Sequence, residues 1–126
     1  MQYMKRIFIS FAIEDAQYRD FLVGQAKNEN SPFEFVDMSV KEPWKTDWKD
    51  RCRTKIKGCD GVIGLISKNT PQATGEIFEL ACAYEEKVPV MLMYINNDRP
   101  NLPSSLSGKR INIWSWSNIK GFINSL

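Results

Sequence analysis

Two acidic residues stand in the stretch SKNTPQATGEIFELACAY, from Ser67 to Tyr84, where an apolar run gives way to the spacing of a helix. Glu76 and Glu79 are the carboxylates of its first turns. The chain has no histidine, which excludes Ser-His-Asp and Cys-His catalysis together with the usual zinc sites. Any catalysis must therefore use carboxylates, hydroxyls or lysines.

Glu79 is the main catalytic candidate. With Thr74 as the N-cap of the helix, the helix dipole should favour the ionised form of Glu79. Ile77 and Leu80 flank it on the buried side, which predicts a position at the edge of the core. Glu76 lies on the same face and competes for any role. A glutamate at a helix start is also commonly a surface charge that interacts with the dipole, and this alternative stays open.

The elements that must position these acids follow from alternating patterns. Apolar runs predict strands at residues 6–11, 33–39, 61–67, 88–95 and 110–116. A segment with helical spacing follows each of the first three strands. A proline-containing loop follows the fourth strand, and a last helix follows the fifth. We predict an α/β fold, a five-stranded parallel sheet with helices on both faces and functional residues at the carboxyl ends of the strands. Asp15 is the expected N-cap of the first helix, and Phe21 and Leu22 belong to its predicted core face.

Length and charge narrow the class of protein. The 126 residues fit a single domain over 1–126. The net charge is only +2, and the basic segment from Lys49 to Lys57 is typical of a solvated helix face, so no nucleic-acid partner is predicted. No apolar run approaches the ~20 residues of a membrane span, and no signal-peptide cleavage site is evident. We expect a cytoplasmic protein without a membrane partner. The three cysteines lack metal-ligand spacing, so no metal is predicted.

Common nucleotide-binding versions of this fold fit poorly. A phospho-accepting receiver domain needs an aspartate after the third strand and a lysine near the end of the fifth, where Ser67 and Ser117 stand. A flavodoxin needs hydroxyls and glycines after the first strand, whereas SFAIED carries two acids that would repel a phosphate. Neither G-x-G-x-x-G nor a P-loop is present.

The chain resembles a Toll/interleukin-1 receptor (TIR) domain along nearly its whole length. RIFISFAIEDAQYRDFL is similar to the first strand and helix of that family, with the serine-aromatic pair at Ser10 and Phe11. FEFVDMS matches the second strand, which Asp37 ends. Ser67 and the segment FEL, with Glu79, fill the places of the serine and glutamate after the third strand. The sequence departs from the family at Gly75, where many members carry tryptophan.

The resemblance implies an enzyme that cleaves the bond between nicotinamide and ribose in NAD+, with Glu79 as the catalytic residue. NAD+ would be the substrate, and no cofactor is implied. Nicotinamide leaves as a neutral molecule, so the enzyme needs no general acid and only has to stabilise positive charge on the ribose. The product would be ADP-ribose or a cyclic ADP-ribose-type messenger for a separate effector protein, as in bacterial Thoeris anti-phage systems.

The resemblance also suggests substrate-binding residues. Phe11 would stack on a ring, Ser10 and Ser67 would bond ribose or phosphate oxygens, and Trp44 would close the cleft. Lys45, like Lys41 in the same loop, would meet the pyrophosphate. The complete predicted substrate-binding set is Ser10, Phe11, Asp37, Trp44, Lys45, Ser67 and Thr74. Simpler interpretations remain, in which Phe11 packs in the core, the serines cap turns and Trp44 belongs to an interface.

Two other functions stay open. Many TIR domains are non-catalytic adaptors that self-associate through the loop after the second strand, here VKEPWK. In such a module Glu79 would only be a helix-terminus charge. Alternatively, GEIFELACAYEEKVPVM is similar to a segment of nucleoside 2-deoxyribosyltransferases, in which the same glutamate would attack an N-glycosidic carbon. The first strand fits the TIR pattern better than the transferase pattern.

Overall fold

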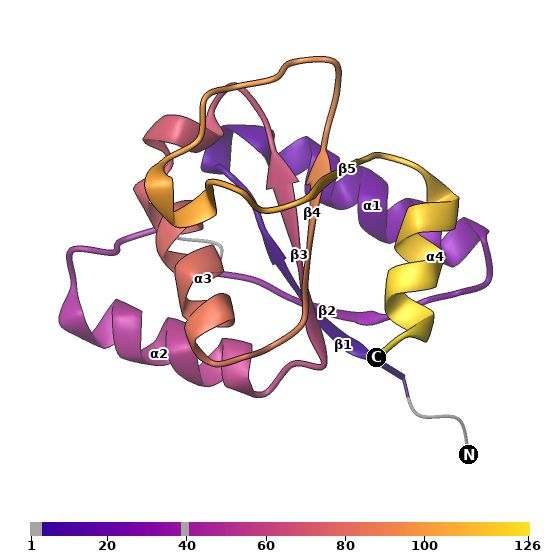
Figure 1. Ribbon diagram of the computed structural model, residues 1–126. Coiled ribbons are helices and arrows are strands. Elements are labelled where there is room, and N and C mark those ends of the chain that lie inside the picture. The colour runs from indigo at the N-terminus through magenta and orange to yellow at the C-terminus, as the bar shows by residue number, and fades with distance from the viewer. Residues whose placement is uncertain (1–3, 39–40) are drawn as a thin grey trace.

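A five-stranded parallel β-sheet forms the centre of the molecule (Figure 1). The computed structural model describes residues 4–38 and 41–126; Ser39, in the second predicted strand, and Val40, in the loop after it, lie outside the described residues. The strands are β1 (Arg6–Ser10), β2 (Glu34–Val36), β3 (Gly61–Ile66), β4 (Val90–Tyr94) and β5 (Ile111–Ile113). The helices are α1 (Ala16–Asn28), α2 (Thr46–Lys57), α3 (Thr74–Glu85) and α4 (Trp116–Asn124), with short 3-10 helices η1 (Ile13–Asp15), η2 (Thr70–Gln72) and η3 (Ser104–Leu106). The predicted fold class is confirmed.

The sheet is covered on both faces. Its strands run in the order β2-β1-β3-β4-β5, and every neighbouring pair is parallel. Helices α1 and α4 lie on one face, and α2 and α3 on the other (Figure 1). Successive strand residues point to opposite faces, so Ile7 and Ile63 join one apolar cluster while Phe8 and Val62 join the other. This double burial explains why the strands are almost continuously apolar.

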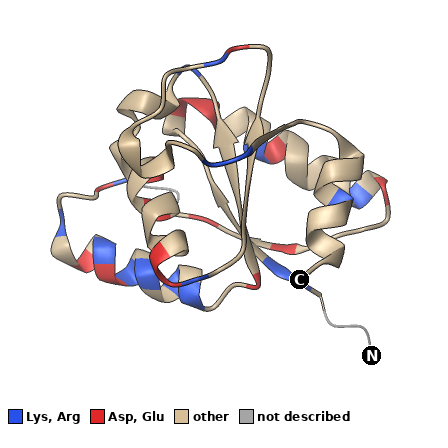
Figure 2. Ribbon diagram, viewed as in Figure 1, with Lys and Arg blue, Asp and Glu red and all other residues tan. Residues whose placement is uncertain are grey.

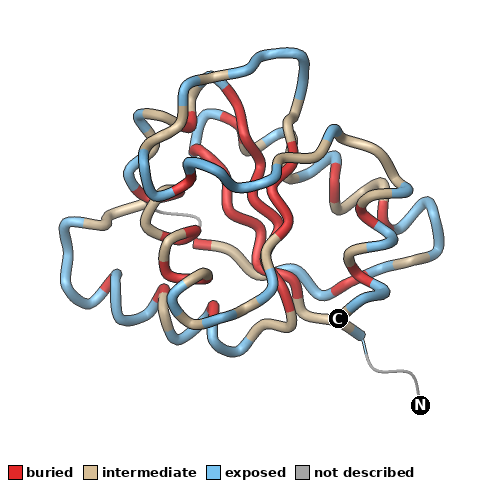
Figure 3. The backbone as a smooth tube through the Cα atoms, in the orientation of Figure 1, coloured by how far each residue is buried: buried red, intermediate tan, exposed pale blue. Residues whose placement is uncertain are grey.

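The central strand β3 brings α3 close to the sheet. All of its residues are buried, as the colours along the middle of Figure 3 show. Gly64 faces α3, and a Cβ atom there would lie 2.8 Å from side-chain carbons of both Leu80 and Leu92. Only a residue without a side chain permits this approach, which sets the height of α3, and thus of Glu79, above the sheet.

Two local predictions are wrong, and one is confirmed. Helix α3 begins at Thr74 with Ala73 as its N-cap, because η2 leads directly into it. The prediction of Asp15 as the N-cap residue of α1 is confirmed, although its side chain makes no capping hydrogen bond. Phe21 is 59% exposed, because α1 turns Leu22 and Ala26 toward the sheet instead.

The basic segment on α2 is balanced by acids. Figure 2 shows acidic and basic residues interspersed along α2, with further acids at the end of α3. Arg53 pairs with Glu85 at 3.2 Å and with Glu86 at 2.5 Å, which ties the two helices together at the surface. No helix in the described ranges combines the length and apolar character needed to cross a membrane.

Candidate functional site

Glu79 is a fully buried acid at the point where the end of β1 meets α3. Its exposed fraction is 0%. Ser10, the last residue of β1, donates a hydrogen bond from Oγ to Glu79 Oε1 at 2.7 Å. Lys41 Nζ donates to Oε1 at 3.0 Å and to Oε2 at 2.7 Å. Three short hydrogen bonds, two of them between opposite charges, hold the carboxylate in one orientation.

Burial sets the charge state of Glu79. Loss of hydration raises the pKa of Glu79 to about 7, although the charge of Lys41 and the hydrogen bonds from Lys41 and Ser10 work in the opposite direction. We expected the helix dipole to favour the ionised form, but desolvation of a side chain with no exposed surface outweighs that effect. Glu79 therefore titrates close to neutral pH.

An aromatic ring accompanies the ion pair. Lys41 Nζ lies 4.5 Å from the centroid of the Phe11 ring, and Arg19 Cζ lies 5.2 Å from it. Arg19 also donates to Asp37 Oδ2 at 2.6 Å, which brings the end of β2 into the same cluster. The site thus places a cation against both a carboxylate and an aromatic face, two groups that attract positive charge.

Gly75 allows Lys41 to reach this position. A Cβ atom on Gly75 would lie 2.8 Å from Lys41 Cβ and 3.2 Å from its Cγ and Cδ. The stem of Lys41 thus packs where a side chain at position 75 would stand. The Lys41 side chain is only 9% exposed, so it closes the site over Glu79.

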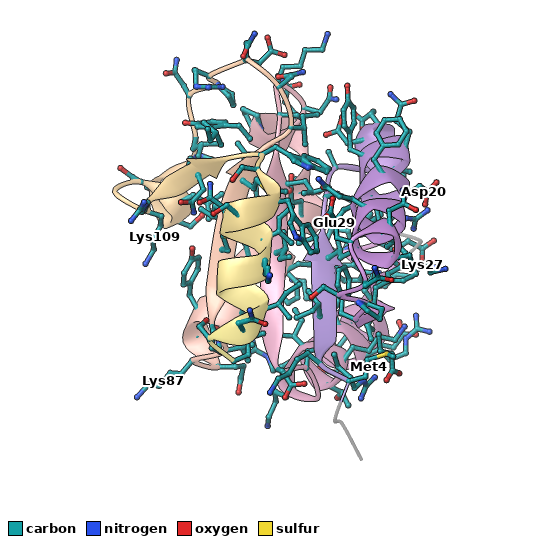
Figure 4. All side chains as sticks on the ribbon, turned by 90° about the vertical axis from the view of Figure 1, so that its right-hand side faces the viewer. Met4, Asp20, Lys27, Glu29, Lys87 and Lys109 are labelled. Carbon is teal, nitrogen blue, oxygen red and sulfur yellow. The ribbon has the colours of Figure 1, made fainter. Side chains whose placement is uncertain are left out.

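A second buried glutamate lies beside the first. Glu76 is 0% exposed, and neither of its carboxyl oxygens has a hydrogen-bond partner. It belongs to the wall of a cavity of about 180 Å³ that also involves Phe11 and Lys41. A larger hollow of about 620 Å³ lies along α1, with Asp20 and Glu29 in its wall (Figure 4). Neither buried glutamate lines that hollow, so the small cavity is the one that belongs to the candidate site.

Residues 8–100, most of the chain, match the family model described as the TIR-like domain of the Thoeris protein ThsB. The chain belongs to this family. The predicted resemblance to TIR domains is thereby confirmed, and the chain is a TIR-like domain of the kind found in Thoeris defence proteins.

A solved structure agrees with the fold of the TIR-like domain. The crystal structure of the TIR domain of the Toll-related receptor TRR-2 from Hydra magnipapillata superposes with a TM-score of 0.72 at 15% identity. The match covers 94% of this chain and 97% of the receptor domain. At this identity the likeness concerns the fold alone. No functionally curated protein matches the chain.

The TIR-like domain brings part of the predicted site together. Ser10 and Phe11 adjoin Glu79, and Asp37 joins them through Arg19. Trp44 lines a groove of about 560 Å³ next to Phe78, and Thr74 lines both this groove and the small cavity of the candidate site. Lys45 is exposed and pairs with Glu42 at 3.1 Å. These residues do not contact Glu79 in this closed arrangement.

Ser67 lies in a buried hydrogen-bond network, and its predicted contact with a substrate stays a prediction. Its hydroxyl donates to Asp15 Oδ2 at 2.5 Å, and Asn69 Nδ2 donates to Asp15 Oδ1 at 2.9 Å. Thr70 Oγ1 accepts from the backbone N–H of Ser67 at 2.9 Å. This buried network joins the loop after β1 to the loop after β3, beside the cavity.

Sequence reasoning assigned Lys41 to a pyrophosphate and did not single out Arg19. A lysine in a polar loop is typical of a solvated residue, and its pairing with Glu79 spans 38 positions. The one usable signal was Gly75, since a glycine at a helix start leaves room that another segment must fill. No local pattern indicates which segment fills it.

Proposed function

We propose that this TIR-like domain cleaves NAD+ at the nicotinamide–ribose bond, with Glu79 as the catalytic residue. The observation that carries the proposal is the contact of one cation with both the Glu79 carboxylate and the Phe11 ring. A site that stabilises an ammonium group in this way suits a substrate that carries a pyridinium ring and passes through a cationic ribose. Family membership supports the same assignment.

The reaction has a simple balance in this site. The C–N bond breaks, and its electron pair returns to the ring nitrogen, so nicotinamide leaves neutral while positive charge develops on the ribose. The ionised Glu79 carboxylate stabilises that charge, and Ser10 keeps the carboxylate in place. Water then adds to the ribose and releases a proton to give ADP-ribose, or a nitrogen of the substrate's own adenine attacks to give a cyclic product.

Lys41 must leave before the substrate can enter. It occupies both oxygens of Glu79 and covers Phe11, so the closed arrangement has no space for the substrate cation. Withdrawal of Lys41 exposes a carboxylate and an aromatic face together. We place this opening under the control of self-association through the loop after β2, with the nucleotide product acting as a messenger for a separate effector in the cytoplasm.

Release of nicotinamide from NAD+ tests the proposal. The protein is incubated with NAD+ at high concentration, with and without a crowding agent, and the products are identified by mass spectrometry. We expect nicotinamide release that Glu79→Gln abolishes and that Glu85→Gln, an exposed position on the same helix, leaves unchanged. Release that persists in the Glu79→Gln protein contradicts the proposal.

A non-catalytic assembly module is the second candidate, and one observation favours it. Trp44 is 73% exposed, which is unusual for a residue whose large apolar surface gains from contact. Absence of nicotinamide release under every assembly condition, together with concentration-dependent association, would favour this function. Supplying a deoxynucleoside and a free base in the same assay exposes a deoxyribosyltransferase activity.

A further inference from the structure

Glu76 is a buried acid that the fold leaves without a hydrogen-bond partner. Its exposed fraction is 0%, and both carboxyl oxygens are unpaired. The other buried acids among the described residues are satisfied, since Asp15 accepts two hydrogen bonds and Glu79 accepts three. Buried polar groups without partners destabilise a fold and are rare in native proteins. Glu76 therefore requires an explanation beyond packing.

The helix does not supply that explanation. Glu76 lies in the first turn of α3, yet the helix has no side-chain cap, and the Glu76 carboxyl makes no bond to the backbone. A methionine has similar length and no unpaired oxygens, so it would fill the same volume without the penalty. An acid retained at such a position is typical of a functional site.

The cavity beside Glu76 shares two of its lining residues with the candidate site. Its volume of about 180 Å³ is below the ~300–1,000 Å³ of pockets that hold whole drug-sized ligands, so it suits one ring-sized part of a larger molecule. Phe11 and Lys41 line it, and both also contact the Glu79 site. Glu76 and Glu79 are one helical turn apart, so a ligand lying against Glu79 can extend to Glu76.

Burial favours the protonated form of the Glu76 carboxyl group. Burial raises the pKa of Glu76 well above its ordinary value, and the negative charges of Glu79 and Asp15 add to this effect. The charge of Lys41 and the nearby Thr70 hydroxyl lower the pKa of Glu76. The geometry of Thr70 relative to the Glu76 carboxyl group is nevertheless not that of a hydrogen bond. The side chain thus offers one O–H donor and one C=O acceptor side by side.

A primary amide matches this pair of groups. Its oxygen accepts from the acid O–H while its NH₂ donates to the acid carbonyl, so both unpaired oxygens are satisfied at once. A phosphate or carboxylate fits poorly, because Asp15 and Glu79 already place negative charge around the cavity. The amide-bearing part of NAD+ is its nicotinamide ring, which is also small enough for the cavity.

We propose that Glu76 is a second substrate-binding residue, whose carboxyl group pairs with the carboxamide of nicotinamide when Lys41 withdraws. This inference rests on the proposed function. It assigns the two glutamates separate tasks, with Glu79 against the ribose and Glu76 at the leaving ring. It also gives the site a basis for selecting an amide over the corresponding acid.

Binding and kinetics with two Glu76 variants test the assignment. Ligand-observed NMR measures the binding of nicotinamide and of nicotinic acid to the wild type, Glu76→Gln and Glu76→Met, each also in a Lys41→Ala background, which removes the side-chain stem that closes the site. We expect Glu76→Gln to bind nicotinamide within about threefold of the wild type, because an amide side chain can form the same paired contact. Glu76→Met should bind at least about tenfold more weakly, and its KM for NAD+ should rise similarly with kcat little changed.

A merely structural role gives a different pattern. Under the proposed binding role, Glu76→Met removes the unpaired oxygens, so it should raise the midpoint of denaturant unfolding even though it weakens binding. The control Glu85→Gln should alter neither binding nor KM. If Glu76→Met fails to fold, the comparison of the two ligands still tests the assignment. The wild type and Glu76→Gln should both bind nicotinamide more tightly than nicotinic acid. Equal binding of the two ligands, unchanged affinity in Glu76→Met, or no nicotinamide binding in the open background overturns the assignment. Nicotinamide binding without NAD+ cleavage refutes only the proposed function.

Discussion

Glu76 and Glu79 lie one turn apart on α3, both fully buried, yet their surroundings differ. Glu79 receives donors from Ser10 and Lys41, whereas Glu76 receives none. The same helix therefore presents one carboxyl group whose pKa is about 7 and one whose pKa is raised by burial and whose oxygens have no hydrogen-bond partner. Paired acids with separated pKa values commonly divide the tasks of a site between them.

Activity should follow the ionisation of Glu79. Because burial raises the pKa of Glu79 to about 7, we expect kcat/KM for NAD+ cleavage to rise about tenfold per pH unit below about pH 6 and to level off above about pH 8. Initial rates of nicotinamide release between pH 5 and 9 measure the profile. A rate that is flat or falls across this interval would show that an ionised Glu79 is not required.

Stability should move in the opposite direction with pH. The folded protein keeps a proton on Glu79 that the unfolded chain has lost above about pH 4.5, so the free energy of unfolding falls as pH rises from about 4.5 to about 7. The loss due to this group is about 3 kcal/mol at 1.36 kcal/mol per pKa unit. Urea unfolding of the wild type and Glu79→Gln at several pH values should show a shallower fall in the variant. Equal slopes would contradict the shifted pKa.

At the scale of elements, the loops after β1 and β3 are joined through Asp15. Asp15→Ala removes the acceptor for Ser67 and Asn69 inside the protein, so we expect a loss of about 1–3 kcal/mol in the free energy of unfolding. Asp20→Ala is the control, because Asp20 is exposed and forms only a surface ion pair with Arg19. Similar stabilities for the two variants would mean that the network contributes little.

The approach of α3 to β3 gives a second test. Gly64→Ala places a methyl group 2.8 Å from Leu80 and Leu92, and we expect it to destabilise the fold by about 1–3 kcal/mol and to displace α3 together with Glu79. Gly24→Ala meets no atom within 4 Å on α1 and should instead stabilise by about 0.5–1 kcal/mol. Thermal unfolding and nicotinamide release measure both effects. A Gly64→Ala protein as stable and active as the wild type would exclude this tight contact.

At the scale of the whole molecule, Trp44 and the 560 Å³ groove beside it are the most exposed apolar features near the site. We predict that Trp44→Ala weakens concentration-dependent self-association and the activity that depends on it, while the unfolding temperature stays within about 2 °C. Sedimentation velocity and nicotinamide release over a range of protein concentrations provide the measurement. Unchanged association in Trp44→Ala would mean that the interface does not include Trp44.

Local patterns along the chain were sufficient for the architecture. Apolar runs and helical spacing depend on neighbours within a few positions, so the five strands and both helical layers followed from the sequence. The choice of Glu79 as the catalytic candidate came from the resemblance to TIR domains, and its role stays a prediction. Strand ends and caps were less well predicted, as Thr74 and Phe21 show, because tertiary packing shifts helix boundaries and orientations.

Tertiary structure alone decided how the site is closed and charged. Ser10 lies 69 positions from Glu79, Lys41 lies 38 positions from it, and Ser67 lies 52 positions from Asp15. No periodicity within one segment encodes such pairings. The raised pKa values of Glu76 and Glu79 likewise follow from the removal of water on all sides, which only the packed molecule produces. The sequence by itself determined which carboxylates were present, and the fold determined which one is paired, which one has no hydrogen-bond partner and which cation covers the site.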